Sequence, residues 1–132
     1  MTDKKRVLVV DDDEATARLL ARFLRDYEVT LAFDGVQGLE RAIATKPQLV
    51  ITDVWMPRMD GIEMVEALKG DPALHVVPVI FLTAVADAPH VAQAITAGAR
   101  HFLPKPVDTD KLLNLVKRSV GYERDAMIEL RK

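Results

Sequence analysis

Short runs of apolar residues alternate along the chain with longer stretches in which apolar residues recur every three or four positions. Unbroken apolar runs are typical of strands buried on both faces, whereas the wider spacing predicts amphipathic helices. The runs that predict strands are residues 7–10, 29–32, 49–51, 76–82 and 102–103. The predicted helical faces consist of Leu19, Leu20, Phe23 and Leu24; Val36, Leu39 and Ile43; Ile62, Val65 and Leu68; Val91, Ala94 and Ile95; and Leu112, Leu113 and Val116.

Residues that favour helix ends and turns fall between these segments. Asp caps the free amides of a helix start, Gly ends a helix, and Pro interrupts helices and strands. Residues of this kind are Asp34, Asp60 and Asp108 at predicted starts, Gly98 at a predicted end, and Pro47, Pro72 and Pro78 between elements. The chain therefore predicts five strand–helix units. Because such crossovers are right-handed and make the strands parallel, we expect an α/β domain: a doubly wound parallel five-stranded sheet with helices on both faces.

Composition narrows the class of protein. The chain has 132 residues, of which 49% are hydrophobic, and a formal net charge of −2; this length suffices for one hydrophobic core. The chain contains no Cys, which excludes disulfides, a thiol nucleophile and cysteine-ligated metals. Near the amino end only residues 7–10 are consecutively apolar, too few for a signal peptide or a membrane span. Since basic residues are also scattered, we expect a cytoplasmic protein that binds neither nucleic acid nor membrane directly.

Acidic residues dominate the predicted carboxyl ends of the strands. Asp11, Asp12 and Asp13 follow the first strand, and Asp53 follows the third. In open parallel sheets, functional groups gather at these ends, near the point where the strand order reverses. If the first and third strands are neighbours, their carboxylates share one pocket and repel one another unless a cation is present. Oxygen-only ligands suit Mg²⁺, so this pattern predicts a magnesium site.

Two further polar residues extend this set. Thr83 ends the fourth strand, and Lys105 follows the fifth. Beside a cation, an ammonium group and a hydroxyl stabilise an incoming phosphoryl group, so the set suits phosphoryl transfer onto a carboxylate. Each residue also has a simpler interpretation when taken singly: helix caps for the first three Asp residues, a turn residue for Asp53 and a solvated charge for Lys105. Their joint placement at four strand ends favours the functional interpretation.

Competing motifs fail on spacing. A phosphatase of the haloacid dehalogenase type requires Asp-x-Asp-x-Thr after the first strand, but Ala15 stands at the Thr position. A calcium-binding EF-hand loop requires Gly and Glu where this chain has Thr16 and Arg22. A flavin-binding flavodoxin would need a Ser-, Thr- or Gly-rich phosphate loop after the first strand, and the acidic residues there would repel the phosphate of the cofactor.

Four separated motifs resemble the receiver domain of two-component response regulators. These motifs are residues 7–13, residues 51–61, the pair Thr83-Ala84 and the pair Lys105-Pro106. They match that family in order and spacing, and the resemblance extends from residue 6 to about residue 120. It implies a flavodoxin-like (βα)5 fold with strand order 2-1-3-4-5.

The resemblance also implies a role for each acidic residue. Asp53 would be the phosphoacceptor, phosphorylated by a sensor histidine kinase or a histidine phosphotransfer protein. Asp12 would ligate Mg²⁺ or Mn²⁺ directly, and Asp11 would act through a bound water. Asp53 itself and the backbone carbonyl of Trp55 would complete the protein ligands. The domain would catalyse its own phosphorylation but act primarily as a signalling switch.

Further residues would hold the phosphoryl group and transmit its presence. In the family, Thr83 and Lys105 would each bind a phosphoryl oxygen, and the peptide bond before Pro106 is expected to be cis. Thr83 and the aromatic Phe102 would form the switch, although an aromatic residue there is also typical of ordinary core packing. The face of the fourth helix, fifth strand and fifth helix would then bind an output domain, an effector protein or a second copy. The alternative is a pseudo-receiver that binds partners without phosphorylation.

Two positions predict the lifetime of the phosphorylated form. Trp55 and Val85 each lie two residues beyond a site residue, Asp53 and Thr83 respectively. In this family these positions flank the path of the hydrolytic water. A bulky indole and an apolar side chain should shield an acyl phosphate, so we expect slow autodephosphorylation. Trp55 packing on the surface loop without any kinetic role is the simpler alternative.

The last residues differ in character from the rest of the chain. We divide the chain into a receiver domain, residues 1–120, and a charged extension, residues 121–132. Positions 113, 116, 120, 123, 127 and 130 keep heptad spacing with only Glu123 polar, which indicates a dimerising helix or a linker to an output domain. Gly121 disfavours an unbroken helix, and a disordered tail is the third alternative.

Overall fold

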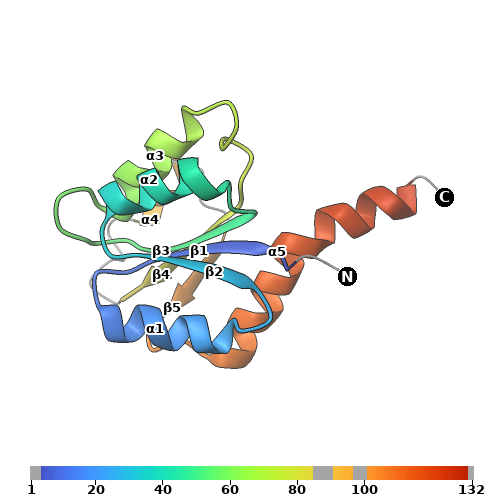
Figure 1. Cartoon of the computed structure of the whole chain (residues 1–132), viewed down its shortest axis with the longest axis horizontal. Coiled ribbons are helices and arrows are strands. Elements are labelled where there is room, and N and C mark those ends of the chain that lie inside the picture. Colours follow the sequence, from blue (N-terminus) through green and yellow to red (C-terminus); the bar gives the residue numbers. More distant parts are fainter. Residues whose placement is uncertain (1–3, 85–90, 97–100, 131–132) are drawn as a thin grey trace.

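The computed structural model describes residues 4–84, 91–96 and 101–130. Five parallel strands form one sheet in the order β2-β1-β3-β4-β5. They are β1 (Arg6–Val10), β2 (Glu28–Ala32), β3 (Leu49–Asp53), β4 (Val79–Thr83) and β5 (His101–Pro104). The helices are α1 (Glu14–Phe23), α2 (Gly35–Thr45), α3 (Gly61–Lys69), α4 (Val91–Thr96) and α5 (Thr109–Leu130). Helices α2, α3 and α4 cover one face of the sheet and α1 and α5 the other (Figure 1), which confirms the expected flavodoxin-like fold and strand order.

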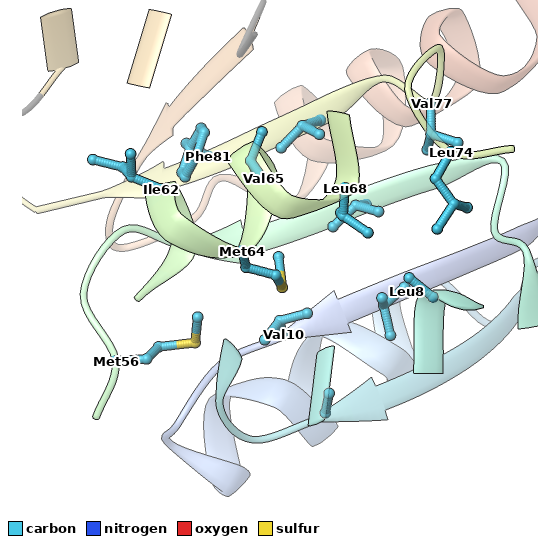
Figure 2. Packing of buried hydrophobic residues seen from close by; sticks show 14 of the residues in the cluster. Leu8, Val10, Met56, Ile62, Met64, Val65, Leu68, Leu74, Val77 and Phe81 are labelled. Carbon is cyan, nitrogen blue, oxygen red and sulfur yellow. The ribbon is translucent and has the colours of Figure 1, made fainter. Parts of the chain in front are cut away.

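The unbroken apolar strands arise because each face of the sheet packs on helices. In β1, Leu8 and Val10 belong to the core on the α2–α3 side, whereas Val7 and Val9 belong to the core on the α1–α5 side. Figure 2 shows the first of these clusters, in which side chains from α3 meet those of the central strands. Burying apolar surface on both faces supplies the main stabilisation of such a sheet.

Several details of the hydrophobic pattern were predicted wrongly. Leu19 and Ile95, both placed on predicted apolar helix faces, are 46% and 56% exposed. The fourth strand begins at Val79 rather than at Val76, whose side chain is 73% exposed, because Pro78 precedes the strand and donates no amide hydrogen bond. In α2, Ile43 was expected in the core but is 52% exposed. Gly38 and Ala42 are buried there instead, since α2 lies so close to α3 that a Cβ on Gly38 would be 2.5 Å from the Met64 sulfur.

The predicted helix caps are confirmed where the structure describes them. The Asp34 side chain accepts from the Gln37 amide at the start of α2, and the Asp60 side chain caps α3. Asp108 accepts from the Lys111 amide at 3.0 Å before α5. Gly98, the predicted helix end, lies outside the described residues.

Helix α5 continues without a break through Gly121 and ends at Leu130. Its last turns extend away from the sheet (Figure 1). The division of the chain at residue 121, and the role of the extension, stay predictions. None of the described helices has the length and apolar character that crossing a membrane requires.

Candidate functional site

The order of the strands brings three carboxylates together. Strands β1 and β3 are hydrogen-bonded neighbours, with Val10 in register with Thr52. Asp11 and Asp12 therefore emerge beside Asp53 at the carboxyl end of the sheet. Each contributes a carboxylate oxygen, and these oxygens all lie within 4.8 Å of one another. This geometry confirms the convergence expected from neighbouring first and third strands.

The three consecutive Asp residues after β1 are not equivalent. Asp11 is fully buried and accepts a hydrogen bond from the Asp13 amide at 2.9 Å, whereas Asp12 is exposed. Asp13 caps α1 by accepting from the Ala15 amide and from the Thr16 hydroxyl. The hydrogen bond from Thr16 holds the pKa of Asp13 below its ordinary value. The helix-cap interpretation thus applies to Asp13, and Asp11 and Asp12 belong to the carboxylate cluster.

Lys105 supplies the positive charge facing this cluster. Its Nζ lies 2.6 Å from Asp53 Oδ1 and 3.5 Å from Asp11 Oδ2. The residue follows β5, its amide donates to the Thr83 carbonyl at 2.8 Å, and its bond to Pro106 is cis, as expected. Burial alone would lower the pKa of Lys105, but pairing with Asp53 and Asp11 holds it above its ordinary value. Lys105 is therefore a cation held at the cluster.

Asp53 is the most perturbed carboxyl group of the cluster. Burial, reinforced by repulsion from Asp11, raises the pKa of Asp53 to about 7 despite the hydrogen bond from Lys105. When all three carboxyl groups are ionised, the one ammonium group of Lys105 leaves two negative charges for a further cation to neutralise. Divalent Mg²⁺ prefers an oxygen-only set in which one or two carboxylates bind directly. The donors present therefore fit such an ion.

Thr83 and Phe102 lie on β4 and β5, the two strands beyond β3 in the sheet. Thr83 ends β4, and its hydroxyl donates to the Leu103 carbonyl of β5 at 3.4 Å. Phe102 is half-buried, and its ring stacks on that of Phe81 with the centroids 6.0 Å apart. Phe102 is thus a core residue at the rim of the sheet, one position before Leu103.

The loop after Asp53, residues 54–60, borders the cluster, and we call it the site loop. Trp55 lies in it with 49% of its surface exposed, while Val85, the second predicted shielding residue, lies outside the described residues. The helix after the loop approaches the site closely, because a Cβ on Gly61 would lie 2.0 Å from the carbonyl oxygen of Asp53.

Sequence reasoning missed one charged contact at this loop. Arg58 donates a hydrogen bond to Asp34, for which the sequence predicts only the role of helix cap. The residues are 24 positions apart in the chain. The sequence does show a charged residue, Arg58, within the motif of residues 51–61, but it does not identify the partner of that charge.

Comparison with known proteins assigns the family. Residues 7–117 match the response regulator receiver domain. The chain is 40% identical over 129 residues to the response regulator PleD of Caulobacter vibrioides, matching 96% of this chain but only 28% of that protein's length. It is 39% identical over 112 residues to hybrid signal transduction histidine kinase D of Dictyostelium discoideum, covering 84% of this chain and 7% of that protein. The chain thus spans a small part of both curated relatives.

A solved structure agrees in fold. The receiver domain of the sensor histidine kinase PA1611 from Pseudomonas aeruginosa superposes with a TM-score of 0.82 at 26% identity, over 91% of this chain and 99% of that one. That protein was crystallised with a magnesium ion coordinated in its active-site cleft. The sequence match and the matching fold lead to one conclusion: this chain belongs to the family of response regulator receiver domains of two-component signalling.

Proposed function

We propose that this receiver domain accepts a phosphoryl group on Asp53 in a Mg²⁺-dependent reaction and signals by a change in shape. The contact between Lys105 Nζ and Asp53 Oδ1, 2.6 Å long and set beside two further carboxylates, carries the proposal. An ammonium group at this distance holds one oxygen of the acceptor and stands where a phosphoryl oxygen would need a counter-charge.

In the reaction, a carboxylate oxygen of Asp53 attacks the phosphorus of a phosphohistidine. The new O–P bond makes an acyl phosphate while the N–P bond breaks, and the imidazole leaves with the electron pair and takes up a proton. Lys105 holds a phosphoryl oxygen during the transfer, and Thr83 donates its hydroxyl to another. These groups act by positioning and charge stabilisation, as phosphoryl transfer requires.

Asp11, Asp12, Asp53 and the backbone carbonyl of Trp55 would hold the Mg²⁺ or Mn²⁺ ion, with Asp11 acting through water. When bound, the ion neutralises charge on the transferred group and on the carboxylates. Asp53 must be ionised to act as a nucleophile, and its raised pKa of about 7 disfavours this state in the absence of a cation. Transfer is therefore expected to be faster above pH 7 and with the ion present.

The partner is proposed to be a sensor histidine kinase or a histidine phosphotransfer protein. After transfer, the phosphoryl group draws Thr83 away from the Leu103 carbonyl and changes the packing of Phe102. The exposed face of α4, β5 and α5 then binds an output domain, an effector or a second copy of the chain. We assign this activity to a cytoplasmic domain of residues 1–120, with residues 121–132 as a charged extension that serves as a linker or tail.

The test is intact-mass spectrometry after incubation with acetyl phosphate, with and without Mg²⁺, on the wild type and Asp53→Asn. We expect one Mg²⁺-dependent phosphoryl adduct that hydroxylamine removes and that Asp53→Asn lacks. If a small donor gives no adduct while Mg²⁺ binds, the same assay with a phosphorylated histidine kinase decides. Absence of both adduct and Mg²⁺ binding would favour the alternative, a pseudo-receiver that binds partners without phosphorylation.

A further inference from the structure

We propose that Asp34, Gly35 and Arg58 form a clamp that positions the site loop, and through it the metal side of the site. Asp34 and Gly35 belong to the start of α2, which contributes none of the carboxylates. Arg58 belongs to the site loop, three residues beyond Trp55. The proposal rests on the proposed function, because it assigns these residues to the positioning of the ligands that the proposed function requires.

The first attachment is a charged hydrogen bond. The Arg58 guanidinium donates to Asp34 Oδ2, and the other carboxylate oxygen, Oδ1, accepts from the Gln37 amide at 2.8 Å. The Asp34 side chain is 6% exposed, while that of Arg58 is 65% exposed. Burial alone would raise the pKa of Asp34, but the Gln37 amide and Arg58 hold it below its ordinary value. Asp34 is therefore a fixed anion to which the loop is tied.

The backbone conformation of Arg58 indicates that its side chain is needed at this position of the turn. Its φ is 70°, in the left-handed region that glycine and asparagine adopt more readily. An arginine at this φ is less favourable than glycine, because its Cβ crowds the backbone. The contact with Asp34 offsets this cost and requires the side chain that glycine lacks.

The second attachment lies one residue along both segments. The Gly35 amide donates to the Met59 carbonyl at 3.0 Å. A Cβ on Gly35 would lie 2.2 Å from that carbonyl oxygen, so only glycine permits the approach. Adjacent residues of α2 thus hold adjacent residues of the loop, which restricts rotation as well as translation of the loop.

The base and the inner side of the loop are already fixed elsewhere. The Gly61 amide donates to the Val54 carbonyl at 2.9 Å and closes the loop at its base. Met56 is buried and points from the loop into the core (Figure 2). The clamp holds the loop at Arg58 and Met59, on the side facing α2. The backbone of Trp55 therefore lies between Val54, which is fixed at the base of the loop, and the residues held by the clamp. A ligand loop that loses one fixed point loses precision, and supporting contacts of this kind typically change metal affinity by about 10- to 100-fold.

The test compares Arg58→Gly with Lys46→Gly. Both remove one cation from a residue with positive φ, since the φ of Lys46 is 49°, and glycine relieves the backbone at each. Lys46 ends α2 at the other end of that helix, so this control matches charge and strain but leaves the site loop intact. We measure Mg²⁺ affinity from the fluorescence of Trp55, the one tryptophan of the chain, and hydrogen exchange at the Gly35 and Gly61 amides.

For Arg58→Gly we expect Mg²⁺ affinity to fall about tenfold and exchange at both amides to speed up, with Lys46→Gly unchanged in both. Asp34→Asn, which keeps the helix cap, should weaken Mg²⁺ binding similarly. The double variant Asp34→Asn/Arg58→Gly should be no weaker than either single one, because the two side chains act as a pair.

The outcomes separate the two proposals. If the wild type binds Mg²⁺ and Arg58→Gly behaves like Lys46→Gly, the clamp is overturned and the proposed function stands. If the wild type neither binds Mg²⁺ nor forms the adduct, the proposed function is overturned and the clamp falls with it. Faster exchange without any change in affinity would also overturn the clamp, since it would show a structural role only.

Discussion

The two halves of the site, at the ends of β1 and β3 and at the ends of β4 and β5, differ in how tightly their side chains are packed and hydrogen-bonded. On the β1–β3 half, Asp11 and Asp53 are buried, and Asp53 is followed by a loop fastened to the core and to α2. On the β4–β5 half, the Thr83 hydroxyl makes a hydrogen bond of 3.4 Å, at the long limit for such a contact. Phe102 there is only half-buried.

This difference follows from what each half must do under the proposed function. Carboxylates that bind a cation must keep their mutual distances, because Mg²⁺ demands near-ideal geometry. A switch residue must instead be able to exchange one partner for another of similar strength. A long hydrogen bond from a half-exposed hydroxyl is easily replaced by a stronger one to a charged phosphoryl oxygen. The comparison predicts that substitutions that crowd the packed backbone of the β1–β3 half cost stability, whereas substitutions at the switch residues of the β4–β5 half cost signalling.

The largest expected effect is at Gly61. In Gly61→Ala the new Cβ would lie 2.0 Å from the Asp53 carbonyl oxygen, so either α3 or the backbone of the phosphoacceptor must move. We expect a loss of about 3 kcal/mol or more in the free energy of unfolding, measured by urea denaturation. Gly70→Ala, at the other end of α3, is the matched control, because its Cβ would meet its nearest neighbour at 3.4 Å. Equal stabilities of the two variants would contradict a tightly built β1–β3 half.

The second effect concerns the charge of Asp53. Its pKa is about 7 in the folded protein, against 3.8 as the ordinary value. Between these values the unfolded chain binds fewer protons than the folded one, so stability without Mg²⁺ falls as pH rises from about 4 to 7 and then levels off. Asp53→Asn removes this loss. We expect its melting temperature without Mg²⁺ to exceed that of the wild type by roughly 5 °C at pH 8 and to match it at pH 4.

Mg²⁺ should reverse that ranking. The ion stabilises the folded wild type in proportion to the logarithm of its concentration over the dissociation constant, while the variant has lost one ligand. With saturating Mg²⁺ at pH 8, we therefore expect the wild type to melt at a higher temperature than Asp53→Asn, which is measured by thermal denaturation. A wild type that is already more stable than Asp53→Asn at pH 8 without the ion would show that the carboxylate cluster is not strained.

The sheet and most of the site were predictable from the sequence, for physical reasons that particular residues illustrate. Unbroken apolar runs such as residues 7–10 identify strands that are covered by helices on both faces of the sheet. In such a strand every side chain, whichever face it points to, is buried and therefore apolar. The strand order came from the resemblance to the receiver family. Together, the apolar runs and the resemblance predict that Asp11, Asp12 and Asp53 share one pocket, as they do.

What escaped the sequence depends on close approach between separate segments. The burial of Gly38 in place of Ile43 reflects the small distance between α2 and α3, and no local pattern encodes a distance between helices. The pairing of Arg58 with Asp34 depends on a positive φ and on the position of a helix in another strand–helix unit. Which of three adjacent Asp residues caps α1 is decided by the backbone turn that aims Asp13 at Thr16.

The third effect is kinetic and concerns Trp55 in the site loop. We expect the Trp55 indole to limit the access of water to an acyl phosphate on Asp53, and an amide in its place to orient that water. Trp55→Asn should therefore speed loss of the phosphoryl group roughly fivefold, which corresponds to about 1 kcal/mol in the barrier, followed by mass spectrometry after removal of the donor. Ile43→Asn, which alters a side chain of similar exposure on α2, should leave the decay rate unchanged. An unchanged rate in Trp55→Asn would mean that the indole only packs on the site loop.

The smallest expected effect on stability is at Thr83. This residue also tests whether the β4–β5 half is the part of the site that changes on phosphorylation. Thr83→Ala removes a long hydrogen bond from a half-exposed side chain, so we expect a loss of only about 0.5 kcal/mol in the free energy of unfolding. Phosphorylation should still occur, because Asp53 and Lys105 are intact. The change in the NMR signals of the Phe102 ring on phosphorylation should disappear in Thr83→Ala and persist in Thr83→Ser, which keeps the hydroxyl. A stability loss above about 1.5 kcal/mol would exceed the usual value of a neutral hydrogen bond and would mean that β4 and β5 are held as firmly as the carboxylate cluster.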